Sequence, residues 1–442
     1  MEEELEEETG QPRIKFINKV MMVFFGIAAL LGWNALLTEL DFFNYFLSDM
    51  NPFVSFGFLN YILNISFQFI LLWKKNIFSL FTELLIGIIG SIVFLIVIPL
   101  SAMTLGKNEM INKVITGGLV VIMGFINACT SGGFFGYAGY YPLEMIVLFT
   151  MGQGLSGIGL NILQYIVLAS VNIDDEEKQY IVRAWIFFGF SIVILLICLF
   201  LLFYSYKDRY CLFYLNKAKM DSLKYPSADS KLLKNFTKEE DNRNEEENQH
   251  VENLDDDEDI LDKISPSFSY VFHKIKSLAI LACYGYVITF ALFPNASIVQ
   301  SIFDIGQYNS VTIISIYNGF DTIGRYLVNL MKPNKTLDYI IVIGRSILLF
   351  TIIFNYYCQE RLVEDNSLTS ILIMVNVAVL GVTNGIGAAL TFGLASRSVE
   401  DEVKEKTGNF IGFFSILGIF LGSCFAFATG AIIDQITVNK KN

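Results

Sequence analysis

Long apolar runs, separated by short polar connections, fill most of the chain. Each of the eleven runs is long enough, at about 20 residues, to cross a hydrocarbon core of roughly 30 Å as an α-helix. None alternates in polarity with period two, as the strands of an outer-membrane barrel do. The pattern predicts an all-α polytopic membrane protein with transmembrane helices at 18–38, 53–73, 78–101, 113–139, 146–171, 181–206, 274–294, 310–331, 338–358, 369–395 and 408–433.

One long hydrophilic segment, residues 207–265, interrupts the series. It holds sixteen acidic and ten basic side chains and is too polar to bury a core, so we expect a disordered acidic cytoplasmic loop. Six helices precede it and five follow, a 6+5 arrangement like that of major-facilitator carriers. The other expected parts are an acidic cytoplasmic tail at 1–17, a six-helix bundle at 18–206, a five-helix bundle at 266–433 and a short extracellular tail at 434–442.

Composition supports a membrane location. Of the 442 residues, 54% are hydrophobic, and the mean hydropathy is +0.52, which is more apolar surface than a soluble domain could hide. The net charge of −12 is concentrated in residues 1–19 and in the hydrophilic loop. We therefore expect the lipid bilayer as a partner, and we interpret the acidity as solvated surface and not as a nucleic-acid or metal site.

Lysine and arginine near the helix ends predict the orientation. The side that carries the N-terminus receives more of these residues than the opposite side, which makes it cytoplasmic by the positive-inside rule. The first apolar run follows MEEELEEE and not a basic leader, so we expect it to be a retained helix. Because no organelle address is visible, the expected location is the plasma membrane.

Residues suited to enzyme chemistry are sparse. The two histidines and six cysteines show no metal-ligand or nucleophile spacing, and the sequence contains no phosphate-binding loop. The stretch GQGLSG at 152–157 matches a dinucleotide fingerprint, but it lies inside an apolar run and not at a strand-to-helix turn. We expect no enzymatic activity, no cofactor and no metal.

Two charges lie within the apolar stretch YNGFDTIGRYLVNL. Asp321 and Arg325 are one helical turn apart, and Asn318 lies on the same face. A charge at mid-bilayer costs about 2.5 to 3.5 kcal/mol on insertion scales, so a charge that persists there usually faces a cavity or a partner. The favoured interpretation is that this face lines a water-accessible solute pathway, and the alternative is a purely structural ion pair.

Other polar or small side chains also stand inside apolar runs. Arg345 has no acid nearby in its own helix, and we interpret it as a structural lock or a snorkelling side chain, with substrate binding as the alternative. Asn60, Asn64 and Gln68 share one helical face, where they either bond to neighbouring helices or line a cavity. The small residues predicted to allow close helix packing are Gly132, Gly136, Gly152, Ser156, Gly159, Gly418 and Gly422.

Motifs found in order along nearly the whole chain resemble those of the equilibrative nucleoside transporter family. They are LLGWN at 30–34, GFFGYAGYYP in the fourth apolar run, MGQGLSGI in the fifth, ITFALFP at the end of the seventh, NGFDTIGR in the eighth and TNG in the tenth. The resemblance implies an eleven-helix, major-facilitator-like carrier that moves purine and pyrimidine nucleosides, or in some members nucleobases, by alternating access. Facilitated diffusion is the default expectation. Proton coupling through Asp321 stays open, although pairing with Arg325 favours the ionised carboxylate.

The resemblance also implies roles for single residues. Asp321 and Arg325, with Asn318 nearby, would bind the ribose hydroxyls, while Trp33 and Leu30 would pack on the base. The extracellular gate would be formed by Asn34, Leu37, Phe293 and Pro294.

Two positions depart from the family motifs. Gly32 replaces the proline that precedes Trp33, which alters how the first helix bends. Ser131 stands where many members use glutamine to read the base, and its hydroxyl is too short to reach the same atoms unless Asn127 substitutes. The base preference therefore stays open, as do two rival functions: a carrier of another hydroxylated solute such as a sugar, and a receptor or scaffold that signals through the acidic loop.

Overall fold

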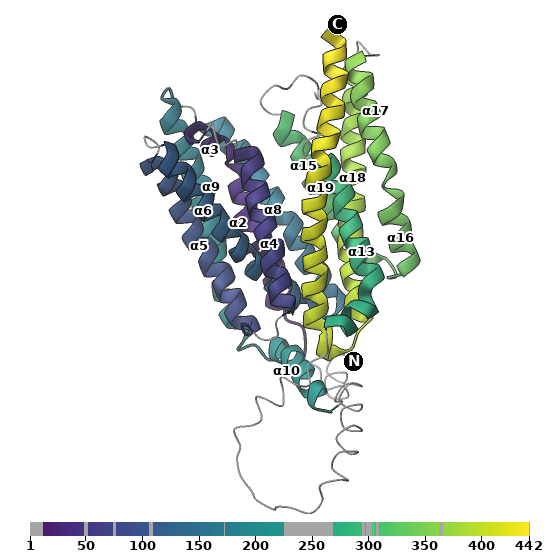
Figure 1. Ribbon diagram of the computed structural model, residues 1–442. Coiled ribbons are helices and arrows are strands. Elements are labelled where there is room, and N and C mark those ends of the chain that lie inside the picture. The colour runs from purple at the N-terminus through teal and green to yellow at the C-terminus, as the bar shows by residue number, and fades with distance from the viewer. Residues whose placement is uncertain are drawn as a thin grey trace, which may run out of the picture.

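The computed structural model describes residues 12–47, 52–73, 77–105, 109–171, 173–224, 268–293, 297, 303, 305, 309–361 and 366–441. Within these ranges the elements are helices, with no strand. They form two bundles side by side, one from each half of the chain (Figure 1). The predicted all-α fold with one bundle from each half of the chain is confirmed.

The N-terminal bundle contains the first six predicted spans. Its fourth span is not a single α-helix, because a π-helical turn interrupts it, and its sixth begins where Asp175 caps the backbone N–H of Lys178. The elements are α2 (Phe16–Thr38), α3 (Leu40–Phe46), α4 (Pro52–Trp73), α5 (Leu80–Leu105), α6 (Glu109–Asn127), η2 (Ala128–Gly132), α7 (Gly133–Gly139), α8 (Leu143–Ser170) and α9 (Glu176–Ser205).

The C-terminal bundle contains the remaining five spans. The predicted span at 338–358 is broken at Arg345 and Ser346 into two helices, and the last helix continues through the predicted tail as far as Lys441. The elements are α13 (Phe268–Leu292), α15 (Asn309–Leu327), η4 (Val328–Leu330), α16 (Lys335–Gly344), α17 (Ile347–Arg361), α18 (Asn366–Arg397) and α19 (Lys404–Lys441).

Each of the eleven predicted spans thus coincides with a helix or with consecutive helices. Among the described residues, nine segments are long and apolar enough to cross a membrane. The two that fall short are α4, whose apolar part is Leu59–Trp73, and α15, which carries Asn318, Asp321 and Arg325.

A helix that the sequence analysis missed lies across one end of the molecule, hereafter the α10 end. α10 (Arg209–Lys224) occupies the start of the segment predicted to be disordered, so that prediction is wrong for these residues. Tyr210 and Cys211 are completely buried, and Lys217 pairs with Asp401 of the C-terminal half at 2.7 Å. The rest of the acidic loop, residues 225–265, lies outside the described residues.

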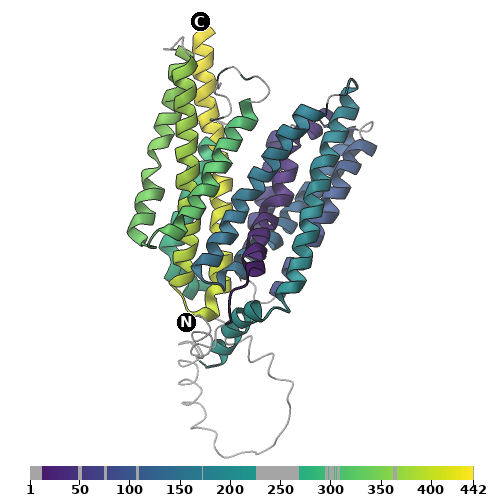
Figure 2. The ribbon, with the colours of Figure 1, turned by 180° about the vertical axis from the view of Figure 1, so that it is seen from behind.

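Several pairs of helices join the bundles: α8 packs against α15 and α18, and α4 packs against α19. At the α10 end α7 also contacts α19, and Phe135 and Phe392 lie 5.2 Å apart between ring centroids. Away from that end the ribbons diverge, as Figures 1 and 2 both show.

Several predicted packing residues lie where helix backbones approach closely. A side chain on Gly152 would meet the backbone of α2 at Val23 and Gly26, and side chains on Gly418 and Gly422 would meet the backbone of α13. Gly132 and Gly136 instead face the side chains of Glu83 and Asn409. Gly159 has open space around it, so the prediction that it mediates packing is wrong.

Candidate functional site

The two charges of α15 form a direct pair. Nε of Arg325 donates to Oδ2 of Asp321 at 2.7 Å, and each side chain is only 5% exposed. Because the residues are four apart in a helix, both point to the same side, as the sequence predicted.

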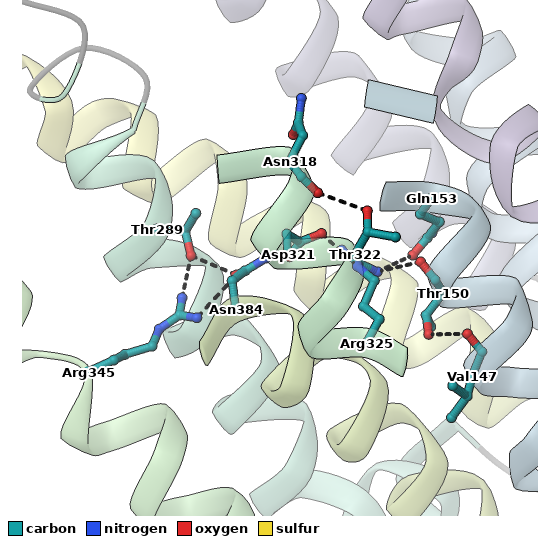
Figure 3. A network of polar contacts seen from close by, with 10 residues as sticks. All are labelled: Val147, Thr150, Gln153, Thr289, Asn318, Asp321, Thr322, Arg325, Arg345 and Asn384. Carbon is teal, nitrogen blue, oxygen red and sulfur yellow. Dashed lines mark hydrogen bonds and ion pairs between the residues drawn. The ribbon is translucent and has the colours of Figure 1, made fainter. Parts of the chain in front are cut away.

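Arg325 also reaches the other bundle. Its Nη1 donates to the backbone oxygen of Thr150 and to Oε1 of Gln153, both at 3.0 Å and both in α8 (Figure 3). One guanidinium therefore joins its own helix to the facing helix of the N-terminal bundle.

Asp321 is held from the opposite side by α18. Nδ2 of Asn384 donates to its Oδ1 at 2.7 Å, and Oδ1 of Asn384 accepts hydrogen bonds from the hydroxyl of Thr289 at 2.7 Å and from Nη1 of Arg345 at 3.1 Å. Arg345 further donates to the Gly285 carbonyl and to Thr289. The result is a continuous polar network that runs from α8 through α15 and α18 to α13 and the break after α16 (Figure 3).

The polar network is buried, whereas the sequence analysis predicted a water-accessible face for Asp321 and Arg325. Asp321, Arg325 and Arg345 are each 4% exposed, so in this conformation the pair does not lie on an open, water-accessible face. Capacity for a ligand remains: Nη2 of Arg325 has no hydrogen bond within the described residues, and each carboxylate oxygen of Asp321 accepts one bond where it can accept two.

Asn318 is half-buried on the same helix. Its backbone oxygen accepts the hydroxyl of Thr322, and its side chain lies against Gly157 of α8. It thus sits at the inter-bundle seam, one turn from Asp321.

Trp33 and Leu30 lie in α2, away from the charged pair's own bundle. Trp33 as a whole is 7% exposed; its ring packs edge-on against Tyr61 and donates through Nε1 to the Tyr61 hydroxyl at 3.0 Å. Leu30 is half-buried. No contact joins either residue to Asp321 or Arg325 among the described contacts.

The residues predicted for a gate fall in two places. Asn34 bonds to Ser156 of α8 at 3.2 Å, and Leu37 is 37% exposed one turn further along α2. Phe293 stacks on Tyr317 with ring centroids 4.1 Å apart, which ties the end of α13 to α15. Pro294 lies outside the described residues.

The amide face of α4 meets the residues predicted to read the base. Nδ2 of Asn127 donates to Asn60 at 2.8 Å, and Nε2 of Gln68 donates to the Ser131 hydroxyl at 2.9 Å. Of the two roles left open for these amides, bonding between helices is present for Asn60 and Gln68. Asn127 and Ser131 thus bond to α4, and no described contact joins them to the Asp321 network.

Arg345 is buried and bonded to α13 and α18, so it does not snorkel, and its contacts are those of a structural lock. Sequence reasoning missed the partners that complete the network: Thr150, Gln153, Thr289 and Asn384. The available signal was polar side chains in apolar helices, since Gln153 and Asn384 stand within motifs already singled out.

Fold and site together define a class: a helical membrane transporter with two bundles. The solved proton:xylose symporter XylE, a major-facilitator protein, matches with a TM-score of 0.63 at 12% identity over 96% of this chain and 94% of its own. The major-facilitator transporter FucP in its outward conformation matches with a TM-score of 0.56 at 12% identity over 96% and 99%. At this identity the likeness shows the fold alone.

Sequence relatives narrow the class. The profile described as nucleoside transporter matches residues 117–431, which is well over half of the chain. The chain is 24% identical to equilibrative nucleotide transporter 4 of Arabidopsis thaliana over 421 residues, 92% of this chain and 94% of the relative. It is 22% identical to equilibrative nucleoside transporter 1 of Rattus norvegicus over 360 residues, 78% and 76% of the two chains. The chain belongs to the nucleoside transporter family, so the resemblance seen in its motifs is confirmed. Its relatives and structural neighbours are transporters and not enzymes.

Proposed function

We propose that this protein moves nucleosides, with nucleobases as a further substrate class, across the plasma membrane by alternating access of its two bundles. The observation that carries the proposal is the position of Arg325, which bonds at once to Asp321 in its own bundle and to α8 in the other. A ribose diol can donate to Asp321 and accept from Arg325. Substrate binding would then change the contacts that hold the bundles together.

The nucleoside has a polar sugar and a flat apolar base, and a site for it needs both kinds of wall. In the proposed cycle the Asp321/Arg325 face, with Asn318 beside it, binds the ribose when the seam between α8 and α15 loosens. Trp33 and Leu30 of α2 supply apolar surface for the base. Asn34, Leu37, Phe293 and Pro294 form the extracellular gate.

We assign the α10 end to the cytoplasm. Cross-bundle contacts gather there: Tyr140, directly after α7, donates to Glu405 of α19, and Ser396 donates to the Gly139 carbonyl at 2.9 Å. The described conformation is thus closed on the proposed cytoplasmic side. The transport mode is facilitated diffusion.

The test is uptake of radiolabelled uridine, adenosine, hypoxanthine and glucose into cells that express the protein, against cells with an empty vector. Saturable uptake of uridine and adenosine is expected, with no glucose uptake. Uptake of glucose without any nucleoside would assign the carrier to another solute.

A further inference from the structure

A second polar site lies at the α10 end, between the two bundles. It is a pocket of about 80 Å³ lined by α4, the residues leading into α5 and its first turn, η2 and the start of α19. Its polar lining includes Gln68, Glu83, Glu405 and Asn409, none of which takes part in the Asp321 network. The pocket is therefore separate from the ribose site proposed above.

Glu83 is the buried acid of this pocket. It lies in the first turn of α5 and is 7% exposed, and within the described residues its carboxylate has no hydrogen bond and no ion pair. The charged residue that acts on it most directly is another acid, Glu405. A carboxylate in so buried a position without a donor is costly, and a ligand that brings donors would offset this cost.

The orientation of Gln68 provides a second acceptor. The Ser131 hydroxyl has a single proton, which it donates to the Asn127 carbonyl at 2.6 Å, so it can only accept the bond from Gln68. Gln68 must therefore use its NH₂ group for Ser131. Its Oε1 is buried without a partner, on a side chain that is 3% exposed and lines the pocket.

The rest of the lining fits a flat ligand rich in N–H donors. Oδ1 of Asn409 is a further acceptor that has no partner among the described residues, and Lys406 adds a cation to the lining. Leu72 and Phe78 add apolar wall. Acceptor side chains from α4, α5 and α19 thus line one pocket beside apolar side chains, a combination that suits a flat ligand with N–H donors.

We propose that this pocket binds a purine base through its N–H donor edge, with the adjacent ring N–H and amino group of guanine facing Glu83 and Gln68. The proposal rests on the proposed function and adds a second station for the substrate, on the cytoplasmic side. It also makes Gln68 and Glu83 the residues that set base preference, in place of the glutamine that Ser131 replaces. Because both bundles line the pocket, a bound base contacts α4 and α5 on one side and α19 on the other, and so stabilises the contact between the bundles at this end.

The experiment uses ribose-free probes, so that it does not depend on the Asp321 site. Inhibition of uridine uptake is measured with 9-methylguanine and with 9-methylhypoxanthine, which lacks the amino group, and thermal stabilisation of the purified full-length protein is measured with the same two compounds. Wild type is expected to prefer 9-methylguanine. Glu83→Gln is expected to reduce that preference about tenfold, since a hydrogen bond to a charged group contributes about 1.5 to 3 kcal/mol.

The matched control is Glu144→Gln, which changes the first-turn glutamate of α8, a side chain that is 50% exposed and paired with Lys19. It should leave the preference unchanged. Equal binding of the two probes by wild type, or an unaltered preference in Glu83→Gln, overturns the inference even where uridine uptake is normal. Should Glu83→Gln fail to fold, Gln68→Leu replaces it in the same assay, where the preference for 9-methylguanine over 9-methylhypoxanthine is again expected to fall. If wild type carries no nucleoside, the proposed function fails, while the stabilisation assay still decides whether the pocket binds a base.

Discussion

Asn384 of α18 donates to Oδ1 of Asp321 at 2.7 Å, while the other carboxylate oxygen accepts from Arg325. The sequence analysis paired Asp321 with Arg325 alone. The structure also connects Asp321 to Arg345, because the Asn384 amide that donates to Asp321 accepts a hydrogen bond from Arg345. Two guanidinium groups and one carboxylate are buried together. The position of Asp321 therefore depends on α18 as much as on its own helix.

Removing the Asn384 amide should weaken substrate binding. In Asn384→Ala, Oδ1 of Asp321 loses its donor and Arg345 loses an acceptor, so the carboxylate is no longer fixed. Because a hydrogen bond to a charged group contributes about 1.5 to 3 kcal/mol, we expect KM for uridine to rise by about tenfold or more. Uptake kinetics at matched surface expression measure this, and an unchanged KM would show that Asn384 does not position the acid.

Arg345→Gln should mainly destabilise the fold. The substitution removes donors to the Gly285 carbonyl and to Thr289, which are buried in α13. Because a hydrogen bond to a charged group contributes about 1.5 to 3 kcal/mol, we expect the Tm of the purified protein to fall by several degrees. An unchanged Tm together with a raised KM for uridine would support the alternative, in which Arg345 binds substrate.

Gly152 and Gly159 form a matched pair on α8. A methyl group at Gly152 would press on the backbone of α2, whereas one at Gly159 meets nothing within 4 Å. Gly152→Ala should therefore lower the yield of folded carrier, and Gly159→Ala should not, because alanine favours helices over glycine. Fluorescence-detected size-exclusion chromatography of both variants measures the yield of folded protein. Equal yields would contradict the close approach of α2 and α8 at Gly152.

Hydropathy was sufficient to find the spans, including α15, because each apolar run is long and bounded by polar residues. It could not find the interruptions. The π turn at Ala128–Gly132 and the break at Arg345 lie inside continuous apolar runs and depend on what packs beside them. The start of α10 was missed because its charges resemble those of the loop that follows, although Tyr210 and Cys211 are buried.

The candidate site was predictable only along a single helix. The spacing of Asp321 and Arg325 fixes their pairing, since both lie on one face. Their partners Gln153 and Asn384 are far away in sequence, and no periodicity connects them. For the same reason the sequence could not show that Ser131 faces Gln68.

Asp208 should make the attachment of α10 dependent on pH. Its carboxylate accepts from Asn18 at 2.8 Å and Lys15 at 3.1 Å, which joins the start of α2 to the start of α10. Burial alone would raise the pKa of Asp208, but hydrogen bonds from Asn18, Lys15 and Tyr204 outweigh it and lower the pKa below the ordinary 3.8. A lowered pKa stabilises the fold above the unfolded value and loses that contribution as the pH falls through the folded one.

Asp208→Asn should therefore lower the Tm at pH 7, and the difference from wild type should shrink below about pH 4. Thermal unfolding of the purified protein across this range measures the effect. Asp175→Asn is the control, because Asp175 pairs with Lys178 at the exposed start of α9. A difference that stays constant with pH would mean that the ionised carboxylate is not what anchors α10.

The most direct test of the account is uptake of uridine and of 2′,3′-dideoxyuridine by wild type and by Arg325→Ala, at matched surface expression. If the Asp321/Arg325 pair binds the ribose hydroxyls, wild type prefers uridine by about tenfold or more, and Arg325→Ala takes up uridine at a greatly reduced rate, no faster than it takes up 2′,3′-dideoxyuridine. Uridine uptake by Arg325→Ala at the wild-type rate, with the preference intact, would contradict the account.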